Sequence, residues 1–352
     1  MLVTEIDTKY VTRSENGFTY ITADNPVFRI GGILPPSRNY GEYYRLDASK
    51  KTDYTDENNR LAEHLSGGTV RFRTDAQQIS IRMTYRAASR DYRHFTDRGV
   101  FGIDIYTGEG TNRQYLGWPG QCWADNTESC QDIAWLDGKT HEIMVNLPLY
   151  GGLTMLEFGF REGDSIDIPS ERSTKPVAFY GSSITQGGCA SRPGTMYPNI
   201  VCRALDCDCI DLGFAGSAHG ELYAADILAK RDISFFVMDY DYNADSPEEL
   251  EKTHRPFYDR FRESHPDTPV LFMSHPVYVL EEEPDLIRRH EIVRTTYEYA
   301  KAKGDKVAFA DGRTFFPKEM RDLNSVDCLH PSDLGMFRMA QTVLDSFKSL
   351  TK

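Results

Sequence analysis

A short apolar run ends abruptly in small polar residues near the middle of the chain. The run Val177–Tyr180 favours a β-strand, and Gly181-Ser182-Ser183 follows it directly. A strand that stops there places a serine hydroxyl at the carboxyl edge of a sheet, where open α/β folds bind their ligands. A serine in a turn or at a helix cap would look the same locally, so the partners of Ser183 decide between the two interpretations. We interpret Ser183 as a nucleophile.

A base and an orienting acid for such a nucleophile occur close together near the end of the chain. A serine hydroxyl attacks only when a base removes its proton, and neutral imidazole is the usual base. A carboxylate must then hold the imidazole in one tautomer and stabilise its protonated form. Asp327 and His330 are three residues apart, so the carboxylate can reach the ring within one turn of chain. The sequence therefore predicts a catalytic triad of Ser183, His330 and Asp327.

Acyl transfer also needs donors for the negative charge that develops on the carbonyl oxygen. The loss of one such donor typically costs ~3 kcal/mol of transition-state stabilisation. Suitable donors are the backbone amides of Ser183 and Gly216 and the side-chain amide of Asn243. A glycine at position 216 lets the backbone come close to the substrate. We predict that these three residues form the oxyanion hole.

Three further polar residues are candidates for substrate binding, and each has a second interpretation. Arg192 suits a substrate carboxylate or a sugar hydroxyl, or an ion pair with surface acids. His219 and His275 follow predicted strands, where a histidine either contacts substrate or has no catalytic role. No metal or cofactor is expected, because the cysteines lack Cys-x-x-Cys spacing and Gly187-Gly188 lacks the rest of a phosphate loop.

The elements that must position these residues alternate between strands and helices from Pro176 onward, which indicates βαβ units and a parallel sheet. Five strands are predicted, over residues Val177–Tyr180, Cys209–Leu212, Ser234–Tyr240, Pro269–Ser274 and Val307–Ala310. Helices are predicted over Tyr197–Leu205, Glu221–Ala229, Pro247–Glu263, Pro284–Lys303 and Ser332–Phe347. Because the carboxyl ends of parallel strands share one edge, the candidate residues should meet there.

The N-terminal half has a different pattern. Segments such as Thr69–Arg73 and Ile79–Met83 alternate apolar and polar residues, and Gly-rich turns separate them. This favours an antiparallel β-sandwich, jelly-roll-like in character. We predict a two-domain protein: a β-sandwich over 1–165, a polar linker over 166–175, and a three-layer α/β domain with a five-stranded parallel sheet, of flavodoxin-like type, over 176–352.

Composition narrows the function classes. The chain has 352 residues and a formal net charge of −13, which disfavours a nucleic-acid or anionic-membrane partner. No apolar run of ~18 residues is present, and the first residues lack the apolar core of a signal peptide. The seven cysteines fit reduced thiols better than a disulfide framework, so we expect a cytoplasmic protein.

The candidate residues also occur in the order of a known family. Residues 176 to 352 resemble the SGNH, or GDSL-type, hydrolases. Gly181-Ser182-Ser183-Ile184 looks like the first family block, Gly216 and Asn243 fall at the oxyanion positions, and Asp327-Cys328-Leu329-His330 looks like the Asp-x-x-His block. The segment Ser183–Gly194 resembles the branch that carries an N-terminal β-sandwich and includes esterases of carbohydrates and other small acyl esters.

The sequence departs from the family pattern at three positions. Ser182 stands in place of an aspartate in the first block, Asp241 in place of a glycine in the third, and Ala244 in place of the aspartate after Asn243. The residues expected to carry the reaction are present. No Gly-x-Ser-x-Gly elbow occurs, which argues against an α/β-hydrolase.

We therefore predict a serine esterase, a carboxylic ester hydrolase, which acts on short-chain acyl esters. The resemblance favours acetyl esters of carbohydrates, so the expected partner is a small-molecule or oligosaccharide ester. Two other functions are compatible with the same sequence. A carbohydrate-binding protein would have lost turnover, and an acyltransferase would use the same triad but exclude water.

Overall fold

The structure is a computed structural model that describes residues 1–86, 94–117, 129–277 and 283–352. The chain divides into two compact units. The first comprises residues 1–51, 62–173 and 192–194, and the second comprises residues 52–61, 174–191 and 195–352. We call them the β unit and the α/β unit.

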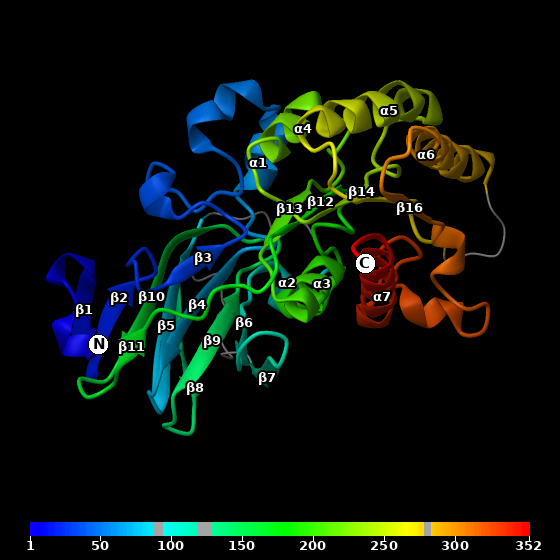
Figure 1. The fold of residues 1–352 in the computed structure, drawn as a ribbon. Helices are drawn as coiled ribbons and strands as arrows, with labels where there is room; N and C mark the ends of the chain where they lie inside the picture. The colour runs from blue at the N-terminus through cyan, green and yellow to red at the C-terminus, as the bar shows by residue number, and fades with distance from the viewer. Residues whose placement is uncertain (87–93, 118–128, 278–282) are drawn as a thin grey trace. The chain divides into compact units, whose positions relative to one another are not determined.

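The β unit contains two antiparallel sheets (Figure 1). One has the strand order β1-β2-β10-β5-β8, and the other has the order β11-β4-β9-β6-β7 with β3 paired to β4. The strands are β1 Val11–Glu15, β2 Phe18–Thr22, β3 Arg29–Gly31, β4 Thr69–Thr74, β5 Gln78–Tyr85, β6 Asp104–Thr107, β7 Gln114–Gly117, β8 Ser129–Trp135, β9 His141–Asn146, β10 Leu153–Phe160 and β11 Ile166–Asp167. The helix α2, Asp97–Val100, precedes β6. The antiparallel β architecture predicted for this half is confirmed, whereas its jelly-roll character stays a prediction.

Side chains of both sheets meet in one apolar core. Phe72 of β4 and Phe158 of β10 come from different sheets, and their ring centroids lie 5.1 Å apart. Both side chains are fully buried. This packing explains the period-two pattern, because alternate residues of each strand point to the core and the others point away from it.

The α/β unit contains a five-stranded parallel sheet with the order β13-β12-β14-β15-β16. The strands are β12 Val177–Gly181, β13 Cys209–Gly213, β14 Phe235–Asp239, β15 Val270–Met273 and β16 Val307–Ala310. Every residue of β12, β13, β14 and β15 is buried. Strands covered on both faces need apolar side chains in both directions, which is why the sequence shows continuous apolar runs here.

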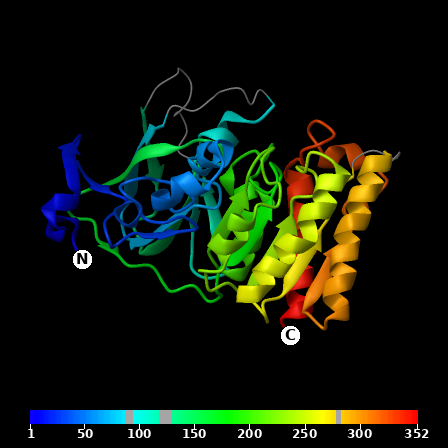
Figure 2. The ribbon, with the colours of Figure 1, turned by 90° about the horizontal axis from the view of Figure 1, so that it is seen from above.

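Helices cover both faces of this sheet (Figures 1 and 2). They are α3 Tyr197–Leu205, α4 Leu222–Leu228, α5 Pro247–Ser264, α6 Pro284–Ala302 and α7 Asp333–Leu350, and α1 Asp56–Ala62 lies beside α4. In Figure 1, α4, α5 and α6 lie on one side of the sheet, and α3 and α7 lie together on the other. The predicted three-layer α/β architecture and its five strands are therefore confirmed.

The strand order places the end of β12 at the point where the order of the strands reverses. Gly181 at the end of β12 pairs with Gly213 of β13 on one side and with Asp239 of β14 on the other. The chain passes from β12 outward to β13 and then returns to build β14, β15 and β16 on the opposite side. Ligands of such folds bind where the strand order reverses, and the residues after Gly181 lie at that point.

A segment from the N-terminal half belongs to the α/β unit. Residues 52–61, which include most of α1, cluster with it. Asn58 donates a hydrogen bond to the hydroxyl of Tyr223 at α4, and the rings of Tyr54 and Tyr223 lie 5.3 Å apart. The predicted domain limits did not anticipate this exchange of chain between the units.

None of the described helices combines the length and the apolar character needed to cross a membrane.

Candidate active site

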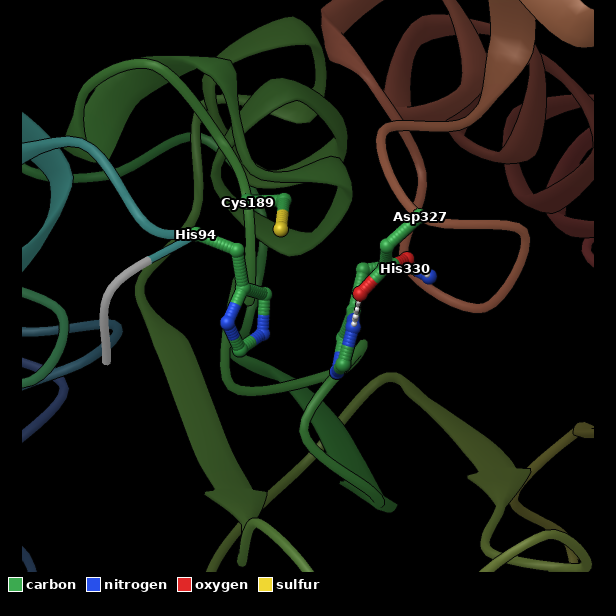
Figure 3. Close-up of side chains that lie close together, drawn as sticks. All are labelled: His94, Cys189, Asp327 and His330. Carbon is green, nitrogen blue, oxygen red and sulfur yellow. Dashed lines mark hydrogen bonds and ion pairs between the residues drawn. The ribbon is translucent and has the colours of Figure 1, made fainter. Parts of the chain in front are cut away.

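Three side chains predicted to act together are in hydrogen-bond contact in the α/β unit. The Oγ atom of Ser183, just beyond β12, lies 2.8 Å from Nε2 of His330. Nδ1 of the same ring lies 2.8 Å from Oδ2 of Asp327 (Figure 3). The imidazole is thus held between a hydroxyl that can give up a proton and a carboxylate that can orient it.

The loop that carries the base and the acid is shaped by its own short-range bonds. Asp327 Oδ1 accepts hydrogen bonds from the backbone amides of Leu329, at 3.0 Å, and His330, at 2.6 Å. Cys328, which follows Asp327 directly, has a left-handed backbone with φ of 65°. These contacts close a tight turn, so that one carboxylate bonds both the backbone and the ring of His330. The spacing of three residues is what allows this.

The turn is anchored on both sides. Val326 donates its amide proton to the carbonyl of His330 at 3.0 Å, and Ser325 forms a bridge with Pro331. Ser332 then caps α7, because its side chain accepts a hydrogen bond from the amide of Gly335. The imidazole therefore projects from a turn that is hydrogen-bonded on both sides and is followed directly by the first residues of α7.

The electrostatic state of Asp327 suits its proposed task. Partial burial would raise the pKa of this carboxyl, but the hydrogen bonds from the amide and ring of His330 and the amide of Leu329 hold it below its ordinary value. The group is therefore a carboxylate at neutral pH, as an orienting acid must be.

The turn that presents Ser183 is fixed by backbone hydrogen bonds. Ser182 donates its amide proton to the carbonyl of Asp239 at 3.2 Å, which ties the turn to the end of β14. The hydroxyl oxygen of Ser182 accepts a hydrogen bond from the amide of Ile184 at 3.2 Å. The carbonyl of Ser183 accepts one from Gly188 at 2.7 Å. The buried serine at 182 thus caps the turn locally, in the position where the family pattern has an aspartate.

The loops that carry the other oxyanion candidates are bonded to each other. The amide of Phe214 donates to the carbonyl of Gly181 at 2.9 Å, and Asn243 Nδ2 donates to the carbonyl of Phe214 at 2.8 Å. Gly216 lies in the same turn with φ of 69°, a conformation that glycine adopts without strain. A side-chain amide has two N–H donors, so Asn243 keeps a second one besides that bonded to Phe214.

The structure places His275 inside the protein. Its side chain is only 4% exposed, and Nδ1 lies 2.8 Å from Oδ2 of Asp241. The backbone amide of His275 also donates to both carboxylate oxygens of Asp241. Arg289 of α6 donates to the carbonyl of Asp241. A substrate contact of His275 does not fit this burial, because the residue is used to hold the end of β14 against β15 and α6.

Arg192 groups with the β unit and is bonded to it. Its guanidinium donates to Oδ2 of the buried Asp104 and, at 2.8 Å, to the hydroxyl of Tyr106. It also lies 3.9 Å from the ring centroid of Tyr115. The structure therefore favours an ion pair for Arg192, but the partner is the buried Asp104 and not one of the surface acids expected from the sequence.

His219 lies in the turn that follows Gly216. Its Nε2 atom is 3.2 Å from the carbonyl oxygen of Gly216, and its amide donates to Glu221 at 3.1 Å. The side chain is partly exposed. Both interpretations of His219 agree with this position, so its role in substrate binding stays a prediction.

Sequence reasoning missed a buried polar cluster under the nucleophile turn. Oδ2 of Asp239 accepts hydrogen bonds from Thr185 Oγ1 and the Tyr197 hydroxyl, both at 3.1 Å. Burial and the charge of Asp241 raise the pKa of Asp239 well above its ordinary value. The sequence does show a carboxylate, Asp239, at the end of an apolar strand. Its hydrogen-bond partners come from two other segments, so the sequence alone does not reveal the cluster.

Comparisons with known proteins identify the family. The model of the GDSL-like lipase/acylhydrolase family matches residues 174–348, and the model of the N-terminus of SGNH-hydrolase-type esterases matches residues 18–166. The chain belongs to this family of SGNH-type esterases and is a carboxylic ester hydrolase by class. None of the curated proteins compared with the chain matches it.

Solved structures share the whole architecture. A putative GDSL-like lipase from Bacteroides ovatus is 25% identical with a TM-score of 0.82, and the match covers 95% of this chain and 98% of that one. The salicylyl-acyltransferase SsfX3 of a tetracycline biosynthetic pathway is 16% identical with a TM-score of 0.76, over 96% and 98% of the two chains. The acetyl xylan esterase Est2A from Butyrivibrio proteoclasticus is 12% identical with a TM-score of 0.56, over 94% and 98%.

Proposed function

We propose that this protein is a serine esterase that hydrolyses short-chain acyl esters, with acetylated carbohydrates as its substrate class. The main support for the proposal is a pair of hydrogen bonds that link the three side chains. Ser183 Oγ lies 2.8 Å from His330 Nε2, and His330 Nδ1 lies 2.8 Å from Asp327 Oδ2. Membership of the esterase family supports the reaction class, and the similarity of the fold to an acetyl xylan esterase supports the substrate class.

The reaction follows from the roles of the three side chains. His330 Nε2 takes the hydroxyl proton of Ser183 as Oγ bonds to the ester carbonyl carbon. The carbonyl oxygen becomes an oxyanion, which the amides of Ser183 and Gly216 and the side chain of Asn243 stabilise. When the carbon–oxygen bond to the alcohol breaks, the imidazolium returns its proton to the leaving alkoxide.

The second half repeats these steps with water. His330 takes a proton from water, the resulting hydroxide adds to the acyl carbon, and the bond to Ser183 Oγ breaks. The serine recovers its proton from the imidazolium, and the acid leaves. Asp327 stays ionised throughout and stabilises the positive ring in each half.

The first prediction concerns the nucleophile. Ser183→Ala should abolish hydrolysis of p-nitrophenyl acetate, because no acyl-enzyme can form, while circular dichroism and the unfolding midpoint stay as in the wild type. Ser182→Ala is the matched control: it removes the neighbouring hydroxyl, which caps the turn, but leaves the nucleophile, so it should keep measurable turnover even if the rate falls. Turnover by the Ser183 variant at the wild-type rate would refute the assignment.

A second candidate function is acyl transfer, which the fold similarity to the salicylyl-acyltransferase favours. The same acyl-enzyme would then pass its acyl group to an acceptor hydroxyl in place of water. Incubating the protein with vinyl acetate and a panel of sugars, followed by mass spectrometry, separates the two. Acylated sugar in excess of free acetate would indicate a transferase, and acetate alone would indicate an esterase.

A further inference from the structure

A buried thiol lies beside the candidate catalytic base. Cys189 is 6% exposed and follows Ser183 by six residues, in a left-handed backbone conformation with φ of 65°. Figure 3 draws its side chain with those of Asp327 and His330. One ligand-capable atom from each of these three residues lies within 4.8 Å of the others. The esterase mechanism has no use for this thiol.

The thiol is not arranged as a nucleophile. Burial, together with the negative charge of Asp327, raises the pKa of Cys189 to about 12. The group therefore stays protonated at neutral pH, and thiols react as thiolates. The acid that raises its pKa is itself held ionised. A sulfur, an imidazole nitrogen and a carboxylate oxygen therefore lie within 4.8 Å of one another with the carboxylate charged.

Each of these three donor types is a known ligand of zinc. Zinc binds cysteine sulfur at about 2.3 Å, histidine nitrogen at about 2.0–2.1 Å and carboxylate oxygen at about 2.0–2.2 Å in tetrahedral geometry. Tetrahedral bonds of these lengths hold ligand atoms roughly 3.3–3.7 Å apart. The ligand-capable atoms of Cys189, His330 and Asp327 lie within 4.8 Å of one another, so modest side-chain movements would bring them to that spacing. Oδ2 of Asp327 would have to move away from Nδ1 of His330, which now lies 2.8 Å from it. A solvent molecule would supply the fourth ligand.

We propose that Cys189, His330 and Asp327 form an inhibitory site for Zn²⁺. Binding displaces the thiol proton to solvent, and the ion takes a lone pair of the imidazole. If the ion bonds Nε2, the proton of Ser183 has no acceptor. If it bonds Nδ1, the remaining proton of the neutral ring lies on Nε2, which again cannot accept. Either mode removes the base, so zinc should inhibit the enzyme reversibly.

A second group of potential ligands among the described residues lies at the end of β14 and does not include the candidate base. Asp241, His275 and His290 are all buried and offer atoms within 4.8 Å of one another. Asp241 and His275 share a hydrogen bond of 2.8 Å, as Asp327 and His330 do, and Arg289 bonds the carbonyl of Asp241. This group serves as the internal control for binding elsewhere in the same unit.

The test of inhibition rests on the proposed esterase activity. Hydrolysis of p-nitrophenyl acetate is followed as Zn²⁺ is added, and each variant is compared with its own rate in EDTA. Cys189→Ser should raise the zinc concentration for half inhibition at least about tenfold, because a ligand is lost. Cys189→Gly, which suits the left-handed backbone, should do the same if the serine variant folds poorly.

Two matched variants locate the site. Cys328→Ser removes an exposed thiol between Asp327 and His330, and His290→Gln disables the second ligand group. Both should keep the zinc sensitivity of the wild type. If either variant loses this sensitivity, or if Cys189→Ser keeps it, the proposed site is wrong.

A binding measurement keeps the proposal separate from the esterase assignment. Co²⁺ added to the Ser183→Ala variant should give a thiolate-to-cobalt charge-transfer absorption at one equivalent, which Zn²⁺ then removes. The band should vanish with Cys189→Ser and persist with Cys328→Ser. Absence of the band overturns the site. If the band is present but the wild type has no esterase activity, the metal site stands and the proposed function fails.

Discussion

At the scale of single residues, the candidate site depends on one carboxylate with several bonds. Asp327 bonds the amides of Leu329 and His330 with one oxygen and the ring of His330 with the other. A single side chain thus sets both the backbone of the turn and the tautomer of the base. With a proton on Nδ1 directed at Asp327, Nε2 can accept the hydroxyl proton of Ser183.

Asp327→Asn is expected to lower kcat by up to about 10⁴-fold, because an amide stabilises the wrong tautomer and not the imidazolium. KM should change little, since the group does not touch substrate. Steady-state kinetics with p-nitrophenyl acetate measures both values. The result would be contradicted by a variant whose kcat stays within about tenfold of the wild type.

The pH profile of the wild type follows from the same residue. The pKa of Asp327 is held below its ordinary value, so the carboxylate loses its charge only below the usual range of aspartate. As the pH falls from about 8 to about 5, Asp327 should therefore stay ionised, and a pH–rate profile should show no loss of activity from this acid over that range.

At the scale of elements, a buried pair of side chains, Asp241 and His275, holds the loop after β14. On the sequence alone, His275 is a candidate for a substrate contact. Asp241 and His275 join the ends of β14 and β15, and Arg289 adds α6 to the same point. Asn243, the candidate oxyanion donor, lies two residues beyond Asp241. His275 and Asp241 act as positioning residues for this loop.

His275→Ala should leave the buried carboxylate of Asp241 without its ring partner and destabilise the fold by about 3 kcal/mol. It should also lower kcat by about 10- to 100-fold, because small displacements of an oxyanion donor are costly. Urea unfolding and steady-state kinetics measure the two effects.

The matched control is His265→Ala. That histidine is also buried, and it bonds the carbonyl of Leu228 at 2.9 Å. It follows α5, at the other end of the α/β unit's strands from Ser183. Stability should fall in this variant while kcat stays at the wild-type value. Equal kcat losses in both variants would show that the effect of His275 is a general loss of structure.

At the scale of the whole molecule, each unit includes a short segment from the other half of the sequence. Residues 52–61 come from the N-terminal half but group with the α/β unit, and Arg192–Gly194 group with the β unit. A cut at residue 174 would therefore not separate the units cleanly. It would remove the side chains of Tyr54 and Asn58, which contact Tyr223.

Tyr223→Ala in the full chain tests how much this contact contributes to the free energy of unfolding. The change removes an aromatic pair and a hydrogen bond, so a loss of about 1–2 kcal/mol is expected in urea unfolding. Leu222→Ala is the control, because Leu222 is exposed and adjacent, and its effect should stay within about 0.5 kcal/mol. Equal losses would mean that residues 52–61 contribute little.

The sequence by itself determined the two architectures, the five parallel strands, and Ser183, His330 and Asp327 as a linked set. These features follow from local patterns: apolar runs, period-two alternation, and a carboxylate three residues from a histidine. The tertiary structure alone decided the burial of His275, the pairing of Arg192 with Asp104, and the nearness of Cys189 to the base. Each of these depends on contacts between segments far apart in the chain, where the residue types leave several partners equally suitable until packing selects one.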